Sequence, residues 1–124
     1  FLGHRSEEEL VRLYRDCSLF VLPSTVETFG NPLVEAMASG VPVATSNAAA
    51  MPEIVADGAI LFDPLDAKDM ADKIIQVLDD AVLAATIARR GRQRSGEFSW
   101  VKTAQETANV LVSAAADRRV VIRR

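Results

Sequence analysis

Two residue types that build many active sites are scarce in this sequence of 124 residues, which has one cysteine and one histidine. Cys17 has no second cysteine for an internal disulfide, which favours a reducing compartment, and its place just ahead of an apolar run predicts a small core residue rather than a nucleophile. His4 alone cannot supply a multi-histidine site, and no aspartate pair has ligand spacing, so we expect no bound metal. No apolar run reaches the roughly 18 residues of a membrane span.

An excess of positive charge is also absent. The formal net charge is −3 and the sequence pI is about 5.1, so the chain has no overall basic field with which to hold nucleic acid. Arginines are concentrated in two short stretches, Arg89, Arg90, Arg92 and Arg94, and Arg118, Arg119, Arg123 and Arg124. A solvated helix end or a solvated tail is the simplest interpretation of each stretch.

Short apolar runs alternate with helix-like patterns along the chain. The runs predict strands near 19–22, 41–44 and 59–62, and the other patterns predict helices near 7–15, 31–39, 66–78, 83–94 and 100–116, with a single helical turn at 52–55. This alternation is typical of βαβ units with a parallel sheet and right-handed crossovers. We therefore predict an α/β fold with a parallel sheet, in which the continuous apolar run at 19–22 suits a strand buried on both faces.

Capping residues mark the ends of two predicted helices. Ser6, with Glu9 three residues later, has the pattern of a capping box. Asn31 is expected to cap the next helix, with Pro32 at its first position, where no amide hydrogen is needed. Gly40 is expected to end that helix.

In open parallel sheets, ligands bind outside the carboxyl ends of the strands. The loops at that edge are 23–31 and 45–51. The first amides of the helix at Asn31 have no intrahelical partner and carry the positive end of the helix dipole, so they predict a seat for an anion such as diphosphate. Gly30 lets the backbone approach such a ligand closely.

Two carboxylates flank this predicted seat. Glu35, about one turn into the helix, could accept hydrogen bonds from two adjacent hydroxyls, as a ribose offers, and Glu27 could accept them from a second sugar. Alternatively, Glu35 only stabilises the helix N-terminus and Glu27 is solvated. The chemistry of the residues alone leaves both interpretations open.

The segment around these acids has a specific pattern. PSTVETFGNPLVEAMASGVPVATSN contains Glu27 and Glu35, and it is accompanied by FLG, EEELVRLYRDCSLFVLPS, PEIVADGAILFDPLD and FSW. These segments resemble the retaining glycosyltransferases of GT-B architecture in the glycosyl transferases group 1 family (family 4), to about residue 112. The resemblance implies a Rossmann-like parallel sheet flanked by helices, as part of the C-terminal, donor-binding domain.

Matching positions in the family imply roles for the residues near the helix start. Glu27, as the catalytic residue, would contact the hydroxyls of the transferred sugar and steady charge near the anomeric centre, and Glu35 would hold the nucleotide ribose. The backbone that would line the donor sugar and diphosphate belongs to Thr28, Phe29, Gly30 and Asn31. Ser24 and Val34 would line the pocket, although a turn role and a core role are the simpler interpretations of these two residues.

One loop departs from the family pattern. The family often has a Gly-Gly pair ahead of Pro-Glu, whereas this chain has Ala48, Ala49 and Ala50 ahead of Met51. Alanine is less permissive than glycine, so the shape of the loop should differ. The S-N-x-x-x-x-P-E version is similar to that of several bacterial polysaccharide mannosyltransferases, which favours a GDP-mannose-like donor. Glu53 is expected to brace this loop.

The resemblance also implies a division of the chain and its partners. Residues 1–116 would be a partial nucleotide-sugar-binding domain, and 117–124 an Arg-rich tail. The donor substrate would be a GDP- or UDP-sugar, with no separate cofactor. A saccharide or lipid-linked acceptor would bind an N-terminal domain outside these 124 residues. We expect this stretch alone to be inactive and to self-associate through an uncovered sheet edge.

The implied activity is that of a bacterial hexosyltransferase that makes surface polysaccharide or a related glycoconjugate with retention, in the cytoplasm or at the inner face of the plasma membrane. Two alternatives stay open. A GT-B-type sugar-nucleotide epimerase would use the same pocket but need no acceptor. A non-catalytic binding module would use the Arg-rich tail on an anionic membrane surface.

Overall fold

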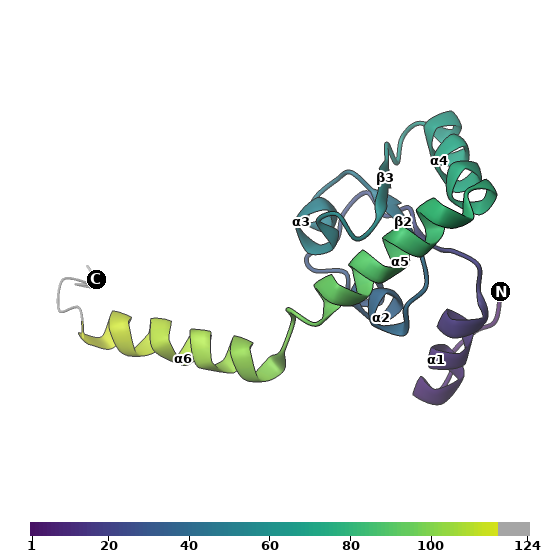
Figure 1. The fold of residues 1–124 in the computed structure, drawn as a ribbon. Helices are drawn as coiled ribbons and strands as arrows, with labels where there is room; N and C mark the ends of the chain where they lie inside the picture. The colour runs from purple at the N-terminus through teal and green to yellow at the C-terminus, as the bar shows by residue number, and fades with distance from the viewer. Residues whose placement is uncertain (117–124) are drawn as a thin grey trace.

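A computed structural model describes residues 1–116 and has a parallel sheet in the order β1 (Phe20–Leu22), β2 (Val43–Ser46) and β3 (Ile60–Phe62) (Figure 1). The helices are α1 (Glu7–Asp16), α2 (Asn31–Ser39), α3 (Met51–Val55), α4 (Ala67–Asp79), α5 (Ala81–Ser95) and α6 (Trp100–Ala116). The predicted α/β fold with a parallel sheet is confirmed. The predicted Arg-rich tail at 117–124 lies outside the described residues.

The three strands differ in burial. All four residues of β2 are buried, whereas every residue of β1 and the first two of β3 are only partly buried. The prediction that the strand at 19–22 is buried on both faces is therefore wrong, because β1 is only partly buried. In the described part of the chain β2 lies between the other two strands, and β1 and β3 form the edges of the sheet.

Helix α2 forms the centre of the core. Its side chains Leu33, Ala36 and Met37 are fully buried, at the i, i+3, i+4 spacing of a single helix face. Helix α5 packs along α2 and also contacts β2. The face of α2 that carries these residues is thus fixed between the sheet and α5.

Two glycines bring α5 close to the loop before β3. A Cβ added to Gly58 would lie 2.7 Å from the Cα of Gly91, and one added to Gly91 would lie 2.9 Å from the carbonyl oxygen of Gly58 and 3.0 Å from Cγ of Met37. These distances are too short for any side chain, so backbone packs directly on backbone here. The absence of a Cβ at both positions allows α5 to reach α2.

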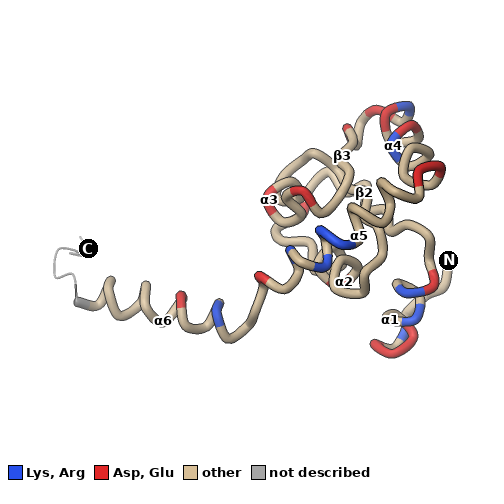
Figure 2. The backbone as a smooth tube through the Cα atoms, in the orientation of Figure 1, with Lys and Arg blue, Asp and Glu red and all other residues tan. Residues whose placement is uncertain are grey.

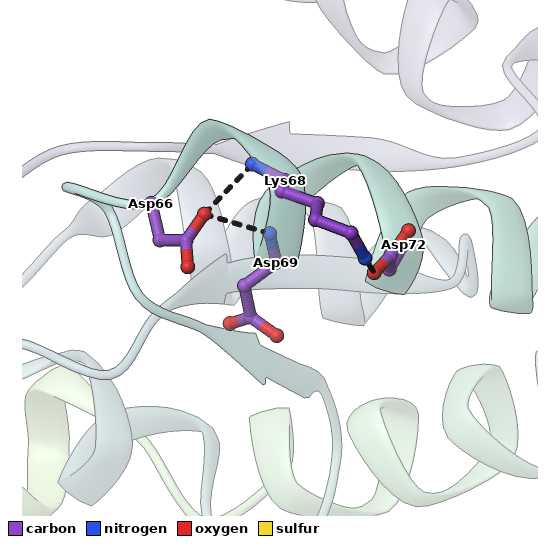
Figure 3. Close-up of polar contacts among 4 residues, drawn as sticks. All are labelled: Asp66, Lys68, Asp69 and Asp72. Carbon is purple, nitrogen blue, oxygen red and sulfur yellow. Dashed lines mark hydrogen bonds and ion pairs between the residues drawn. The ribbon is translucent and has the colours of Figure 1, made fainter.

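Local capping explains where helices begin. The predicted capping box is present, because Ser6 Oγ accepts from the Glu9 amide at 3.3 Å and Glu9 Oε2 accepts from the Ser6 amide at 3.0 Å. At the start of α4, Asp66 Oδ1 accepts from the amides of Lys68 and Asp69 (Figure 3). These bonds satisfy amides that have no partner within the helix.

Cys17 is exposed, so the prediction of a core cysteine is wrong. It is the C-cap residue of α1, and its thiol donates to the carbonyl of Tyr14 at 3.3 Å. The buried part of the following segment begins only after Cys17, where partly buried Leu19 precedes β1. The apolar run begins where it was expected, after Cys17, but burial does not extend back to the cysteine.

The first arginine stretch is not uniformly solvated. Arg89 and Arg92 are exposed, but Arg94 is partly buried. Its Nε donates to the carbonyl of Ile54 at 3.0 Å and its Nη2 to the carbonyl of Glu53 at 2.9 Å. Arg94 thus joins the end of α5 to α3, and the simple interpretation is wrong for this residue.

Helix α6 extends away from the rest of the molecule (Figure 1). Residues 101–115 are all exposed, and Trp100 at the start of the helix is 85% exposed. Charged residues are few along α6 compared with α1 and α4 (Figure 2). Among the described residues, no helix combines the length and apolarity needed to cross a membrane.

Candidate functional site

The start of α2 is built by a left-handed glycine. Gly30 is the N-cap residue, with φ 80° and ψ 58°, and no side chain caps the helix. The prediction that Asn31 caps α2 is therefore wrong: Asn31 is the first helical residue, because the chain turns one position earlier at the residue that tolerates positive φ. Pro32 is accordingly the second helical residue rather than the first, and Gly40 ends the helix as predicted.

This kind of start leaves the predicted anion seat open. No side chain caps the helix and the first turn has no acidic residue. Pro32 has no amide hydrogen and the Leu33 amide donates to the carbonyl of Gly30 at 2.9 Å, so the donors that an anion could use here are the backbone amides of residues 28–31. Thr28, Phe29 and Asn31 are exposed around the buried Gly30. Backbone donors and the positive end of the helix dipole are thus available to an anion at this point.

Glu27 is held beside the α2 start by a hydroxyl. It is partly buried, and Ser24 Oγ donates to its Oε1 at 3.0 Å. Its Cβ lies 4.0 Å from the position that a Cβ on Gly30 would take. Ser46 in β2 donates in turn to the carbonyl of Ser24 at 2.6 Å. The carboxylate is therefore tied to the strand ends rather than only solvated.

Glu35 is held by a second hydroxyl, from a different helix. The Tyr14 hydroxyl in α1 donates to Glu35 Oε2 at 3.1 Å, while the Glu35 side chain stays exposed. Burial, and next the hydrogen bond to Glu35, raise the pKa of Tyr14 to about 12. The hydroxyl therefore stays protonated, and remains a donor, at any physiological pH.

The predicted site residues fall into a connected group and a separate pair. Residues 27–31 form one turn at the carboxyl end of β1, with Ser24 bound to Glu27. Glu35 shares neither a hydrogen bond nor a hydrogen-bond partner with Glu27 in residues 1–116; it pairs with Tyr14 instead. Glu27 thus precedes the start of α2 and Glu35 follows it, and each has one carboxylate oxygen bound by a protein hydroxyl.

Tyr14 is the residue that sequence reasoning missed. Its ring belongs to the core: Tyr14 is 6% exposed and meets Phe20 edge-to-face, with ring centroids 5.4 Å apart. A buried tyrosine hydroxyl normally needs a partner, and that requirement was the available signal. Its partner is 21 positions away, beyond any local pattern.

Val34 and Phe29 both have packing roles in the structure. Val34 is partly buried against the core, in line with the simpler interpretation. Phe29 meets Phe98 edge-to-face, with ring centroids 5.5 Å apart, and the guanidinium of Arg94 lies 4.8 Å from the Phe98 centroid. The turn that carries Gly30 is therefore attached to the segment between α5 and α6.

The alanine loop shows the cost of its departure from glycine. Ala49 has φ 50°, in the left-handed region that glycine adopts without strain. Buried Thr45, just before the loop, donates to the carbonyl of Leu22 at 3.0 Å. The loop is thus anchored to β1 even though one alanine is strained. Glu53 is exposed, and its carbonyl, not its carboxylate, braces the fold through Arg94.

Among the residues that the structure describes, no group of three or more His, Cys, Asp or Glu side chains is placed to hold a metal ion. The polar groups at the α2 start are instead backbone amides, two carboxylates and hydroxyls. This set can bind an anion through the amides and neutral hydroxylated groups through the acids.

Comparison with known proteins gives consistent matches. The model of the family described as "Glycosyl transferases group 1" matches residues 1–94. The O-antigen chain mannosyltransferase B of Escherichia coli is 38% identical over 109 residues, which cover 88% of this chain and 29% of that protein. A glycogen synthase of Mycobacterium tuberculosis is 37% identical over 122 residues, covering 96% of this chain and 30% of that protein. The chain thus spans about 30% of the length of these relatives.

Solved structures agree in fold. The sucrose-phosphate synthase of Thermosynechococcus elongatus has a TM-score of 0.82 at 31% identity, over 94% of this chain and 30% of that one. Anabaena HepE, solved in complex with UDP, has a TM-score of 0.80 at 32% identity, over 91% of this chain and 32% of that one.

Proposed function

The chain belongs to the glycosyl transferases group 1 family, and from this premise we propose that residues 24–35 form the donor side of a glycosyl-transfer site. The observation that carries the proposal is the start of α2, where the backbone of residues 28–31 has no side-chain cap and stands in the sequence between two carboxylates that are each held by a hydroxyl. A nucleoside-diphosphate sugar has the matching order of groups: ribose, diphosphate, hexose.

Each part of the site has a separate task in this proposal. The amides that open α2, with the backbone of residues 28–31, bind the diphosphate and stabilise the charge that develops as it leaves. Glu35 accepts hydrogen bonds from the ribose hydroxyls. Glu27 accepts them from the hexose and stabilises positive charge near the anomeric carbon. Ser24 keeps the carboxylate of Glu27 in place, and we keep retention of configuration as part of the proposal.

We propose GDP-mannose as the first donor to test and a UDP-hexose as the second. The name of the E. coli relative, an O-antigen chain mannosyltransferase, and the alanine loop support mannose. The UDP complex of HepE supports uridine as the alternative base. A saccharide or lipid-linked acceptor would meet the donor from the remainder of a longer protein.

We keep the prediction that a polypeptide limited to residues 1–124 transfers no sugar, because the described residues offer groups for the donor only, and positioning of both substrates supplies much of such catalysis. The cytoplasm, where nucleotide sugars would be available, is the location we propose. An exposed free thiol at Cys17 suits a reducing compartment.

Calorimetry on the full-length protein with GDP- and UDP-sugars tests the proposal. Glu35→Ala should weaken binding by about 1–3 kcal/mol, the usual cost of losing hydrogen bonds to a charged group. Glu8→Ala is the matched control, since it removes the same charge from an exposed position on α1 and should leave affinity unchanged. Equal affinities of wild type and Glu35→Ala would refute the ribose assignment.

Incubation of the full-length protein with donor alone separates the two enzyme classes. A transferase leaves the hexose stereochemistry of the donor intact until an acceptor is added, whereas an epimerase converts it. Epimerised donor in the absence of acceptor would therefore replace the transferase proposal with the epimerase.

A further inference from the structure

We propose that Tyr14 is a positioning residue for Glu35: its hydroxyl holds one carboxylate oxygen so that the other faces the ribose hydroxyls of the bound nucleotide. The inference rests on the proposed function, because it takes Glu35 as the ribose contact. It adds a residue from α1, outside the segment that the family pattern assigns to the donor.

The two ends of this contact differ in freedom. The ring of Tyr14 is fixed, since the residue is 6% exposed and packs edge-to-face on Phe20 at an interplanar angle of 72°. Glu35 is exposed and is reached by Tyr14 OH at 3.1 Å. The rigid Tyr14 hydroxyl therefore restrains the Glu35 side chain, which would otherwise sample several rotamers.

Restraint of this kind should increase affinity for a ribonucleotide. A glutamate loses rotamer freedom when it binds a ligand, and a hydrogen bond already present in the free protein removes part of that loss. A carboxylate has about four acceptor sites, so one bond from Tyr14 leaves capacity for two adjacent hydroxyls. Tyr14 thus selects one orientation of Glu35 without blocking it.

The Tyr14 hydroxyl stays protonated, and so remains a hydrogen-bond donor, over a wide pH range. Burial keeps the pKa of Tyr14 near 12, above its usual value of 10.0. The hydroxyl would stop donating only in strongly alkaline solution. Positioning by Tyr14 should therefore show no pH dependence between about pH 6 and 9, unlike positioning by a histidine.

A double-mutant cycle on the full-length protein tests the proposal, with UDP and GDP as the probes and calorimetry as the readout. Tyr14→Phe, which keeps the ring, should weaken binding about five- to tenfold. Glu35→Ala should weaken it more, and Tyr14→Phe should have no further effect in the Glu35→Ala background. In turnover assays Tyr14→Phe should raise KM for the donor and leave kcat unchanged.

Ser39→Ala is the matched control. Ser39 Oγ donates to the main-chain carbonyl of Glu35 at 2.9 Å, so this variant removes a hydroxyl bound to the same residue but leaves the carboxylate untouched. Its affinity should equal that of wild type. Binding of a 2′,3′-dideoxynucleoside diphosphate should be equal for wild type and Tyr14→Phe, which tests the role even if the variant is less stable.

The outcomes separate this inference from the proposed function. If Tyr14→Phe weakens binding equally in the Glu35→Ala background or toward the dideoxynucleotide, Tyr14 acts through packing and the inference is wrong. If Glu35→Ala weakens binding and Tyr14→Phe does not, the inference fails and the ribose assignment stands. If Glu35→Ala has no effect, the ribose assignment itself fails.

Discussion

Helices α2 and α6 are both rich in apolar residues, yet one is the centre of the core and the other is exposed along its length. In α2, Leu33 and Met37 stand at i and i+4 on one face and are fully buried, and Val34 beside them is partly buried. In α6 Val110, Leu111 and Val112 are consecutive and point in different directions around the helix, and each is between 64% and 69% exposed. Both helices contain adjacent apolar residues, so they differ in what packs against them: α2 contacts α1, α3, α5 and β2, whereas residues 101–115 of α6 are exposed.

The contrast is sharpest for the same substitution in each helix, measured by chemical denaturation of this chain. Leu33→Ala in α2 should lower the free energy of unfolding by about 4 kcal/mol, since Leu33 is fully buried and leaves a cavity. Leu111→Ala in α6, at 64% exposure, should change it by less than about 0.5 kcal/mol. Similar losses for the two variants would mean that α6 is packed in solution and would break the comparison.

The next largest effect tests the close packing of the body of the molecule, by which we mean residues 1–98, without α6. Gly58→Ala should cost about 3 kcal/mol, because the new Cβ meets the backbone of Gly91, which cannot rotate away as a side chain could. Gly96→Ala, between α5 and α6, is the control: its nearest contact would be 3.3 Å, so its cost should be far smaller. Comparable denaturation midpoints for the two variants would contradict the backbone contact.

A smaller effect is expected at the junction between body and α6. Arg94→Ala should cost about 2 kcal/mol, since two carbonyls of α3 lose a charged donor and Phe98 loses its cation–π partner. Arg89→Ala, from the same helix but exposed, should be nearly neutral. Thermal melts of the two variants are the measurement. Destabilisation by Arg94→Ala alone would show that the contacts of Arg94 form in solution, whereas two unchanged melting temperatures would contradict them.

The smallest effect has the opposite sign. Ala49→Gly should raise the free energy of unfolding by about 0.5–1 kcal/mol. Glycine adopts φ 50° without strain, and this gain should exceed the extra backbone entropy that glycine loses on folding. Ala48→Gly is the control, since Ala49 has positive φ and its neighbour Ala48 does not; it should destabilise slightly. A loss of stability at position 49 would show that the loop relaxes in solution.

Local patterns predicted most of the fold because they act over a few residues. The Ser6–Glu9 capping box and the end of α2 at Gly40 needed only neighbouring chemistry. The burial of β1 was harder to predict, because it depends on which strands lie beside β1 in the sheet. The cap at Asn31 was misassigned because preceding Gly30 offered a competing conformation, left-handed backbone, that needs no side-chain bond.

The candidate site was predictable in its residues but not in its supports. Glu27 and Glu35 stand in a specific sequence pattern, whereas the Tyr14–Glu35 bond joins two helices and depends on how α1 packs on α2. The role of Arg94 was hidden for the same reason, because its acceptors are 40 and 41 positions away. Contacts of such separation are set by tertiary packing, which leaves no trace in a window of a few residues.

The single tryptophan of this chain lies in the exposed part of the molecule, at the first residue of α6. Its indole is already surrounded by water in the folded state, with 85% exposure, so its fluorescence emission should change little when the body unfolds. A blue shift, in contrast, would report that something has covered α6. Trp100 is thus a built-in optical reporter for contacts of the projecting helix, and folding studies of the body need circular dichroism or an added fluorophore.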